Sequence, residues 1–144
     1  MWLVSTVLVL PAQQPGYSSG VGAFLNGDVP SRLVRAEAGP GSLAARTCSA
    51  ISGMAPSAPL TVVAFGDSAL LLPAVALAQR TAPRLVVEYV LVDAELPPVT
   101  ETWPDARVTV VTDDDGSAAS VQGRLRGWSV VGHAEFARWR PEPA

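Results

Sequence analysis

Two side chains and a run of aspartates in this sequence have the types and the order that acyl-transfer chemistry requires. Ser68 lies between an apolar run and an Ala- and Leu-rich stretch, so we expect it on a sharp turn from a strand to a helix. His133, the only histidine, follows the acidic turn at 113–115. A serine hydroxyl needs a base at neutral pH, and imidazole is matched to that pH. A carboxylate behind the imidazole fixes its tautomer. The pattern predicts a nucleophile, a base and an acid.

The elements that must position these residues follow from the hydrophobic pattern. Near-continuous apolar runs without polar alternation are typical of strands covered on both faces. The predicted strands are 3–10, 31–36, 60–65, 85–92, 107–112 and 129–131, and the predicted helices are 43–54, 69–80, 118–126 and, weakly, 21–25. Alternation of strands and helices predicts an α/β fold with three layers and a mainly parallel sheet of about six strands.

Length and composition indicate one domain over residues 1–140, followed by a flexible tail at 141–144. The chain has 144 residues, of which 16% are charged, and a net charge of −3, so nucleic acid is not an expected partner. One cysteine, Cys48, excludes an internal disulfide and leaves a structural zinc site without ligands. No apolar run reaches the ~18 residues that cross a bilayer. We expect a cytoplasmic protein that needs no metal and no cofactor.

Taken together, these segments resemble the α/β-hydrolase superfamily, in the form of a minimal member without a cap domain from a GC-rich bacterium. The segments that carry the resemblance are 4–12, 32–42, Gly66-Asp67-Ser68, 72–76, 90–97, 112–116 and Gly132-His133. Two positions depart from the family pattern. Leu70 stands where the elbow has a glycine, and Pro11 stands in the loop that usually begins His-Gly.

The resemblance assigns roles to further residues. It makes Asp115 the acid that orients His133, and it places the oxyanion-binding backbone N–H groups at Ala12 and Ala69. The alternative acids are Asp113, Asp114 and Asp93.

Trp103, Trp128 and Leu70 are candidates for lining an apolar acyl pocket. For the two tryptophans, packing in the core is the favoured role.

The predicted activity is serine-dependent acyl transfer through an acyl-enzyme on an ester or thioester. Only a dozen residues separate Asp93 from the strand that starts at Arg107, which is too few for a lid. An open site favours plain hydrolysis, as in a thioesterase, or a bulky partner that covers the cleft. The second case describes an acyltransferase of specialised biosynthesis, with a carrier-protein donor or a peptide acceptor. Leu70 and Pro11 motivate the alternative, a non-catalytic binding module of the same fold.

Overall fold

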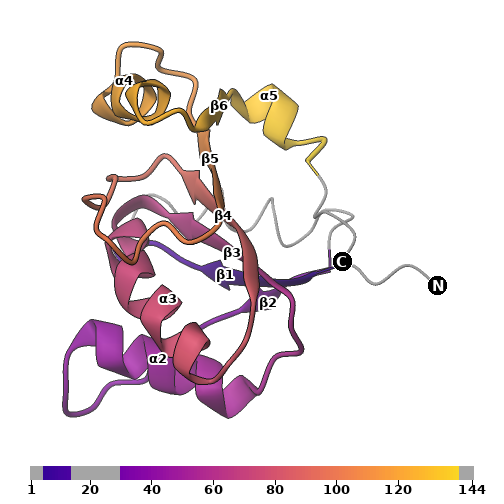
Figure 1. Cartoon of the computed structure of the whole chain (residues 1–144), viewed down its shortest axis with the longest axis vertical. Coiled ribbons are helices and arrows are strands. Elements are labelled where there is room, and N and C mark those ends of the chain that lie inside the picture. The colour runs from indigo at the N-terminus through magenta and orange to yellow at the C-terminus, as the bar shows by residue number, and fades with distance from the viewer. Residues whose placement is uncertain (1–4, 14–29, 140–144) are drawn as a thin grey trace.

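The structure, a computed structural model, describes residues 5–13 and 30–139 of the chain. Six parallel strands form one sheet in the order β2-β1-β3-β4-β5-β6 (Figure 1). The strands are β1 (Thr6–Leu10), β2 (Arg32–Leu33), β3 (Leu60–Phe65), β4 (Val86–Val92), β5 (Arg107–Val111) and β6 (Ser129–Val131). The helices are α2 (Leu43–Met54), η1 (Gly66–Leu71), α3 (Leu72–Thr81), α4 (Ala118–Leu125) and α5 (His133–Phe136).

Alternate residues of the strands point to two separate apolar clusters, one on each face of the sheet. The larger cluster packs against α2, α3 and α4, through Ile51, Val75 and Ala119 among others. The smaller one is built from valines of the central strands together with Phe65, and it packs against Phe136 of α5 and against Trp139. All six residues of β3 are buried, and all of them except Thr61 are apolar, as expected for a strand that is covered on both faces.

Serine residues start two of the helices. Ser42 accepts a hydrogen bond from the backbone N–H of Ala45 and so caps α2, and Ser117 caps α4 in the same way through Ser120. Such a cap satisfies one of the backbone donors that a helix leaves unpaired at its N-terminus. These two caps fix where the loops end, and therefore where α4 begins after the acidic turn.

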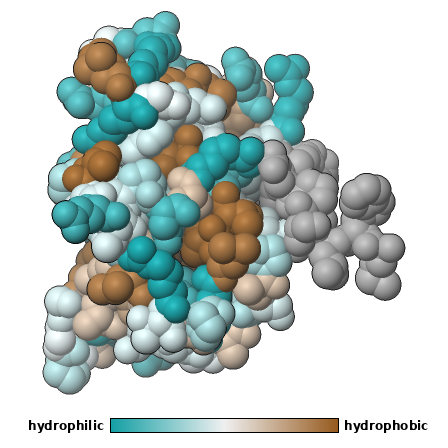
Figure 2. Space-filling model, in the orientation of Figure 1, coloured by the Kyte–Doolittle hydropathy of each residue, from teal (hydrophilic) through white to brown (hydrophobic). Residues whose placement is uncertain are grey.

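The predicted fold class is confirmed, with a wholly parallel sheet of six strands and helices on both of its faces. The segment from 93 to 106 forms neither helix nor strand, so no cap is built between β4 and β5. The predicted helix at 21–25, residues 1–4 and the tail at 141–144 lie outside the described residues. Figure 2 shows apolar side chains in separate groups among hydrophilic ones on one face of the molecule.

Candidate active site at the carboxyl edge of the sheet

The carboxyl ends of the parallel strands bring the predicted site residues to one edge of the sheet. Pro11 follows β1, Gly66 follows β3, Asp93 follows β4 and His133 lies two residues beyond β6. This edge is where ligands bind in open α/β sheets. The strand order places β3 and β4 side by side, with β5 between β4 and β6.

Ser68 lies inside η1 and is buried, with only 1% of its surface exposed. Its hydroxyl donates a hydrogen bond to the carbonyl oxygen of Pro11 and not to His133. The hydroxyl is therefore held by the main chain of the loop after β1. In this conformation Ser68 is neither accessible to a substrate nor in contact with a base.

The imidazole of His133 forms a hydrogen bond with the carboxylate of Asp93. The Nε2 atom of His133 lies 2.9 Å from Oδ1 of Asp93, and both side chains are about two-fifths exposed, 41% and 43%. The backbone N–H of His133 also donates to Oδ1 of Asp113, at 2.9 Å. In a serine triad Nε2 takes the proton of the nucleophile, whereas here this nitrogen faces the carboxylate. Asp93 and His133 form a dyad that Ser68 does not join.

The carboxylate beside the imidazole belongs to Asp93, one of the predicted alternatives, and not to Asp115. Asp115 extends from the acidic turn to Arg124 of α4, with 3.0 Å between its Oδ1 and the guanidinium. Asp114 accepts the backbone N–H of Gly116, at 3.0 Å, and Asp113 contacts the main chain of His133 rather than its ring. The aspartates of the acidic turn thus bind the backbone of the turn, Arg124 of α4 and the backbone N–H of His133, and none of them binds the imidazole ring.

The two residues predicted to donate the oxyanion-binding N–H groups differ in burial. Ala69 is fully buried within η1, whereas Ala12 is half-buried against the smaller cluster. Next to Ala12, the backbone N–H of Gln13 donates to Oδ1 of Asp67, at 2.8 Å. A side-chain carboxylate therefore occupies one N–H of the loop after β1. This contact could not be predicted from the residues alone, because it depends on the conformation of that loop.

The aromatic candidates pack in the interior. Trp103 is fully buried and makes edge-to-face contacts with Tyr89 and Trp128, each with ring centroids 5.7 Å apart. Trp128 is half-buried and stacks under the guanidinium of Arg126, at 4.9 Å. Leu70 is exposed, at 46%. The structure therefore shows Trp103 in the packing role.

The clear pKa shifts fall on residues outside this edge. Burial raises the pKa of the Cys48 thiol, which makes the nucleophilic thiolate scarcer. Burial and the nearby carboxylate of Asp105, which accepts the Tyr89 hydroxyl at 2.6 Å, raise the pKa of Tyr89 far above its ordinary value. Neither group is poised as a nucleophile at neutral pH.

A groove of about 520 Å³ opens beside the dyad, within the size range of small-molecule sites. Its lining comes from the loop after β4, the acidic turn and the start of α4: Asp93, Ala94, Glu95, Leu96, Thr112, Asp114, Ser117, Ala118, Ala119, Gln122 and Arg126. Asp93 belongs to both the dyad and the groove. A ligand in this groove therefore reaches the carboxylate that holds His133.

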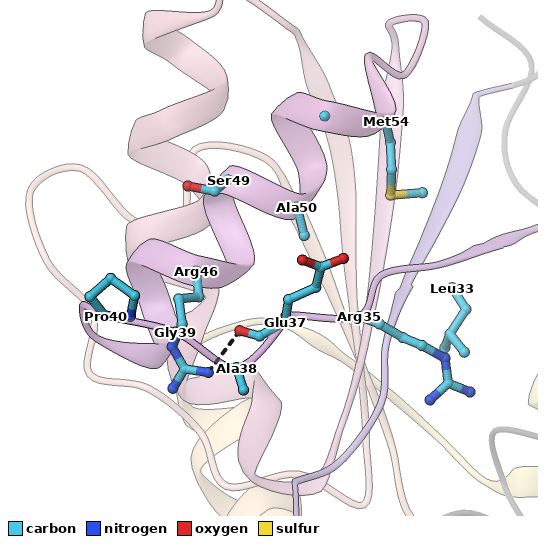
Figure 3. Close-up of a pocket in the computed structure, with 11 residues that line it drawn as sticks. Leu33, Arg35, Glu37, Ala38, Gly39, Pro40, Arg46, Ser49, Ala50 and Met54 are labelled. Atoms are coloured by element: carbon cyan, nitrogen blue, oxygen red, sulfur yellow. Dashed lines mark hydrogen bonds between the residues drawn. The ribbon is translucent and has the colours of Figure 1, made fainter.

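A second groove, of about 600 Å³, lies between α2 and the segment that follows β2 (Figure 3). Leu33, Ala50 and Met54 supply apolar lining, and Arg46 donates to the carbonyl oxygen of Glu37, at 3.1 Å. Because none of the predicted site residues lines this groove, we place the candidate site at the dyad.

Within the ranges 5–13 and 30–139, no three His, Cys, Asp or Glu side chains gather so that they could hold a metal ion. No helix in the same part of the chain has the length and apolarity to cross a bilayer.

No family model and no curated protein matches the chain. Among solved structures, the chain is similar to the NocB thioesterase domain, determined as a covalent complex with a fluorophosphonate nocardicin G analog. The sequence identity is 16% and the TM-score is 0.53, and the alignment covers 90% of this chain and 82% of that domain.

The comparison shows the fold. The chain has the α/β architecture of a thioesterase domain, with its sheet and helices matched over most of both chains. At this identity the likeness shows the fold alone and does not extend to substrate or activity.

Proposed function

We propose that this protein is a thioesterase-fold binding module that holds an acyl ester or thioester without forming an acyl-enzyme at Ser68. The observation that carries the proposal is the state of Ser68, which is buried and donates its hydroxyl to the carbonyl of Pro11. A nucleophile must present its oxygen to the substrate and to a base. Ser68 does neither.

The groove beside Asp93 is the proposed seat of the ligand. It is about 520 Å³ in volume, enough for an acyl chain or for part of a pantetheine arm. Asp93 and Glu95 supply carboxylates on one wall, while Ala118 and Ala119 supply small side chains on another. The ester or thioester class is taken from the fold likeness and from the dyad, whose imidazole and carboxylate suit a polarised carbonyl.

A second candidate is the activity predicted from the sequence, hydrolysis or acyl transfer through Ser68. The Asp93–His133 dyad favours it, because an imidazole held by a carboxylate is the base that such chemistry uses. For this candidate, η1 would have to rearrange so that Ser68 leaves Pro11 and reaches the imidazole. A carrier-protein donor and a peptide acceptor belong to this candidate alone.

Covalent labelling separates the two candidates. We expect no mass increase when the purified protein is incubated with an alkyl fluorophosphonate and measured by intact mass spectrometry. An adduct that maps to Ser68 and disappears in Ser68→Ala would replace the binding module with the acyl-enzyme.

Binding is tested by titration calorimetry with an acyl-pantetheine thioether. In this analogue a methylene group between the sulfur and the acyl carbon replaces the cleavable thioester bond. Ala118→Trp fills the groove from the exposed start of α4 and should abolish binding. Val121→Trp places the same bulk on an exposed position of α4 that does not line the groove, and it should leave binding unchanged. Absence of binding to the unaltered protein, together with absence of labelling, would exclude both candidates.

A further inference from the structure

The residue at the tip of the turn after β3 is Gly66. It directly follows Phe65, the last residue of the strand, and its φ is +58°, in the left-handed region. An acyl-transfer nucleophile sits on this kind of sharp, strained turn between a strand and a helix. Ser68 comes two residues later; both residues belong to η1 and both are buried. The tip of the turn therefore carries no side chain.

The sheet register places Gly66 next to the dyad. Phe65 pairs with Val92 across β3 and β4, so the residues that follow them, Gly66 and Asp93, leave the sheet side by side, on strands that lie ~4.8 Å apart. The backbone N–H of Glu95 donates to the carbonyl oxygen of Gly66, at 3.3 Å. Gly66 is thus the turn residue adjacent to the carboxylate that holds His133.

The local sequence fits the same assignment. In the pattern Gly-x-Ser-x-Gly, small residues two positions before and after the nucleophile relieve crowding in the turn. Centred on Gly66, the corresponding positions are Ala64 and Ser68, which are both small and both buried. Centred on Ser68, the later position would be Leu70. The burial of Ser68 therefore has a structural reason, since it takes the place of a small residue under the turn.

We infer that position 66 is the nucleophile position of this fold and that glycine leaves this buried position without a nucleophilic side chain beside the Asp93–His133 dyad. The inference deepens the proposed function and rests on it, because it locates the bound carbonyl over the backbone of Gly66. The ligand class is an acyl ester or thioester whose carbonyl faces the imidazole without being attacked by the protein.

The inference predicts a gain of covalent chemistry in Gly66→Ser. The new hydroxyl attacks the phosphorus of a fluorophosphonate, so that an O–P bond forms and the P–F bond breaks. The hydroxyl proton passes to Nδ1 of His133, because Nε2 faces Asp93, and fluoride leaves. We expect one adduct per chain, mapped to position 66 by peptide mass spectrometry, where the unaltered protein gives none.

Three matched variants test the assignment. Gly66→Ala carries the same backbone constraint without a hydroxyl and should give no adduct. Ser68→Ala in the Gly66→Ser background should label as fast as Gly66→Ser alone. His133→Ala in that background should slow labelling by about a hundredfold or more, the usual contribution of a general base. A folded Gly66→Ser protein, judged by circular dichroism, that gives no adduct would overturn the inference.

A measurement on the unaltered protein covers the case in which Gly66→Ser does not fold. An acyl-pantetheine thioether with a diazirine at the carbonyl position should cross-link to residues 65–67 and 93–95. Cross-links confined to the groove at residues 33–54 would overturn the inference. Labelling of the unaltered protein at Ser68 would instead remove the proposed function, so the two failures are distinguishable.

Discussion

The two halves of the sheet's carboxyl edge hold their polar residues in opposite ways. In the half formed by β1 and β3, Ser68 and Asp67 bind main-chain groups of the loop after β1. In the half formed by β4 and β6, Asp93 and His133 bind each other through their side chains and remain exposed beside a groove. A position at the carboxyl edge of the sheet therefore does not by itself give a residue a chemical role. The role depends on which partner the polar atoms of that residue bind.

Local backbone conformation produces this difference. Ser68 belongs to a 3₁₀ turn of η1 that packs beneath the strand end, so its hydroxyl meets the carbonyl of Pro11. Asp93 adopts a left-handed conformation, with φ at +47°, in the residue directly after β4. Aspartate tolerates this conformation better than most residues. One half is consequently fixed by its backbone, and the other presents side chains to solvent.

The largest expected effect is a difference in unfolding free energy between variants in the two halves of the carboxyl edge. Ser68→Ala leaves the carbonyl of Pro11 without its buried donor and should lower the free energy of unfolding by about 2 kcal/mol. His133→Ala breaks an exposed pair and should lower it by about 0.5 kcal/mol. Urea unfolding followed by circular dichroism measures both values. Equal losses for the two variants would contradict the comparison, because they would mean that His133 is as deeply built into the fold as Ser68.

A smaller effect tests the backbone argument at Asp93. Asp93→Ala puts a Cβ without a local polar partner into the left-handed region and should cost about 1 kcal/mol of unfolding free energy. Asp93→Gly relieves that constraint while it also removes the carboxylate, so it should remain within about 0.5 kcal/mol of the unaltered protein. If Asp93→Gly were as unstable as Asp93→Ala, the lost contact with His133 rather than the backbone would account for the loss.

Most of the fold could be predicted from the sequence. The stretches 60–65 and 129–131 are strands and 43–54 is a helix with the predicted bounds. For 60–65 the reason is that buried parallel strands are almost continuously apolar. The predicted helix at 69–80 is instead η1 followed by α3, with Pro73 in the first turn of α3. The short helix α5 was not predicted, because four residues carry no periodic signal.

The pairing of side chains at the site could not be predicted in the same way. Four aspartates follow β4 or β5, and which of them meets His133 depends on loop conformation rather than on chain order. Arg124 of α4 binds Asp115, and only the packing of α4 brings that guanidinium into reach. Gly66 did carry a signal, since a glycine directly after a buried strand often marks a left-handed turn.

The smallest effect is expected at Asp115, where a substitution should change stability and affinity very little. Asp115→Asn weakens one exposed ion pair with Arg124, so the free energy of unfolding should change by less than about 0.5 kcal/mol. The affinity for the acyl-pantetheine thioether should change by less than about twofold. The carboxylate of Asp93 both lines the groove and holds the imidazole. Asp93→Asn keeps the shape of the side chain but removes this charge, so it should weaken the affinity measurably. The reverse ranking in calorimetry would return Asp115 to the role of the acid and would show that the acidic turn rearranges when the ligand binds.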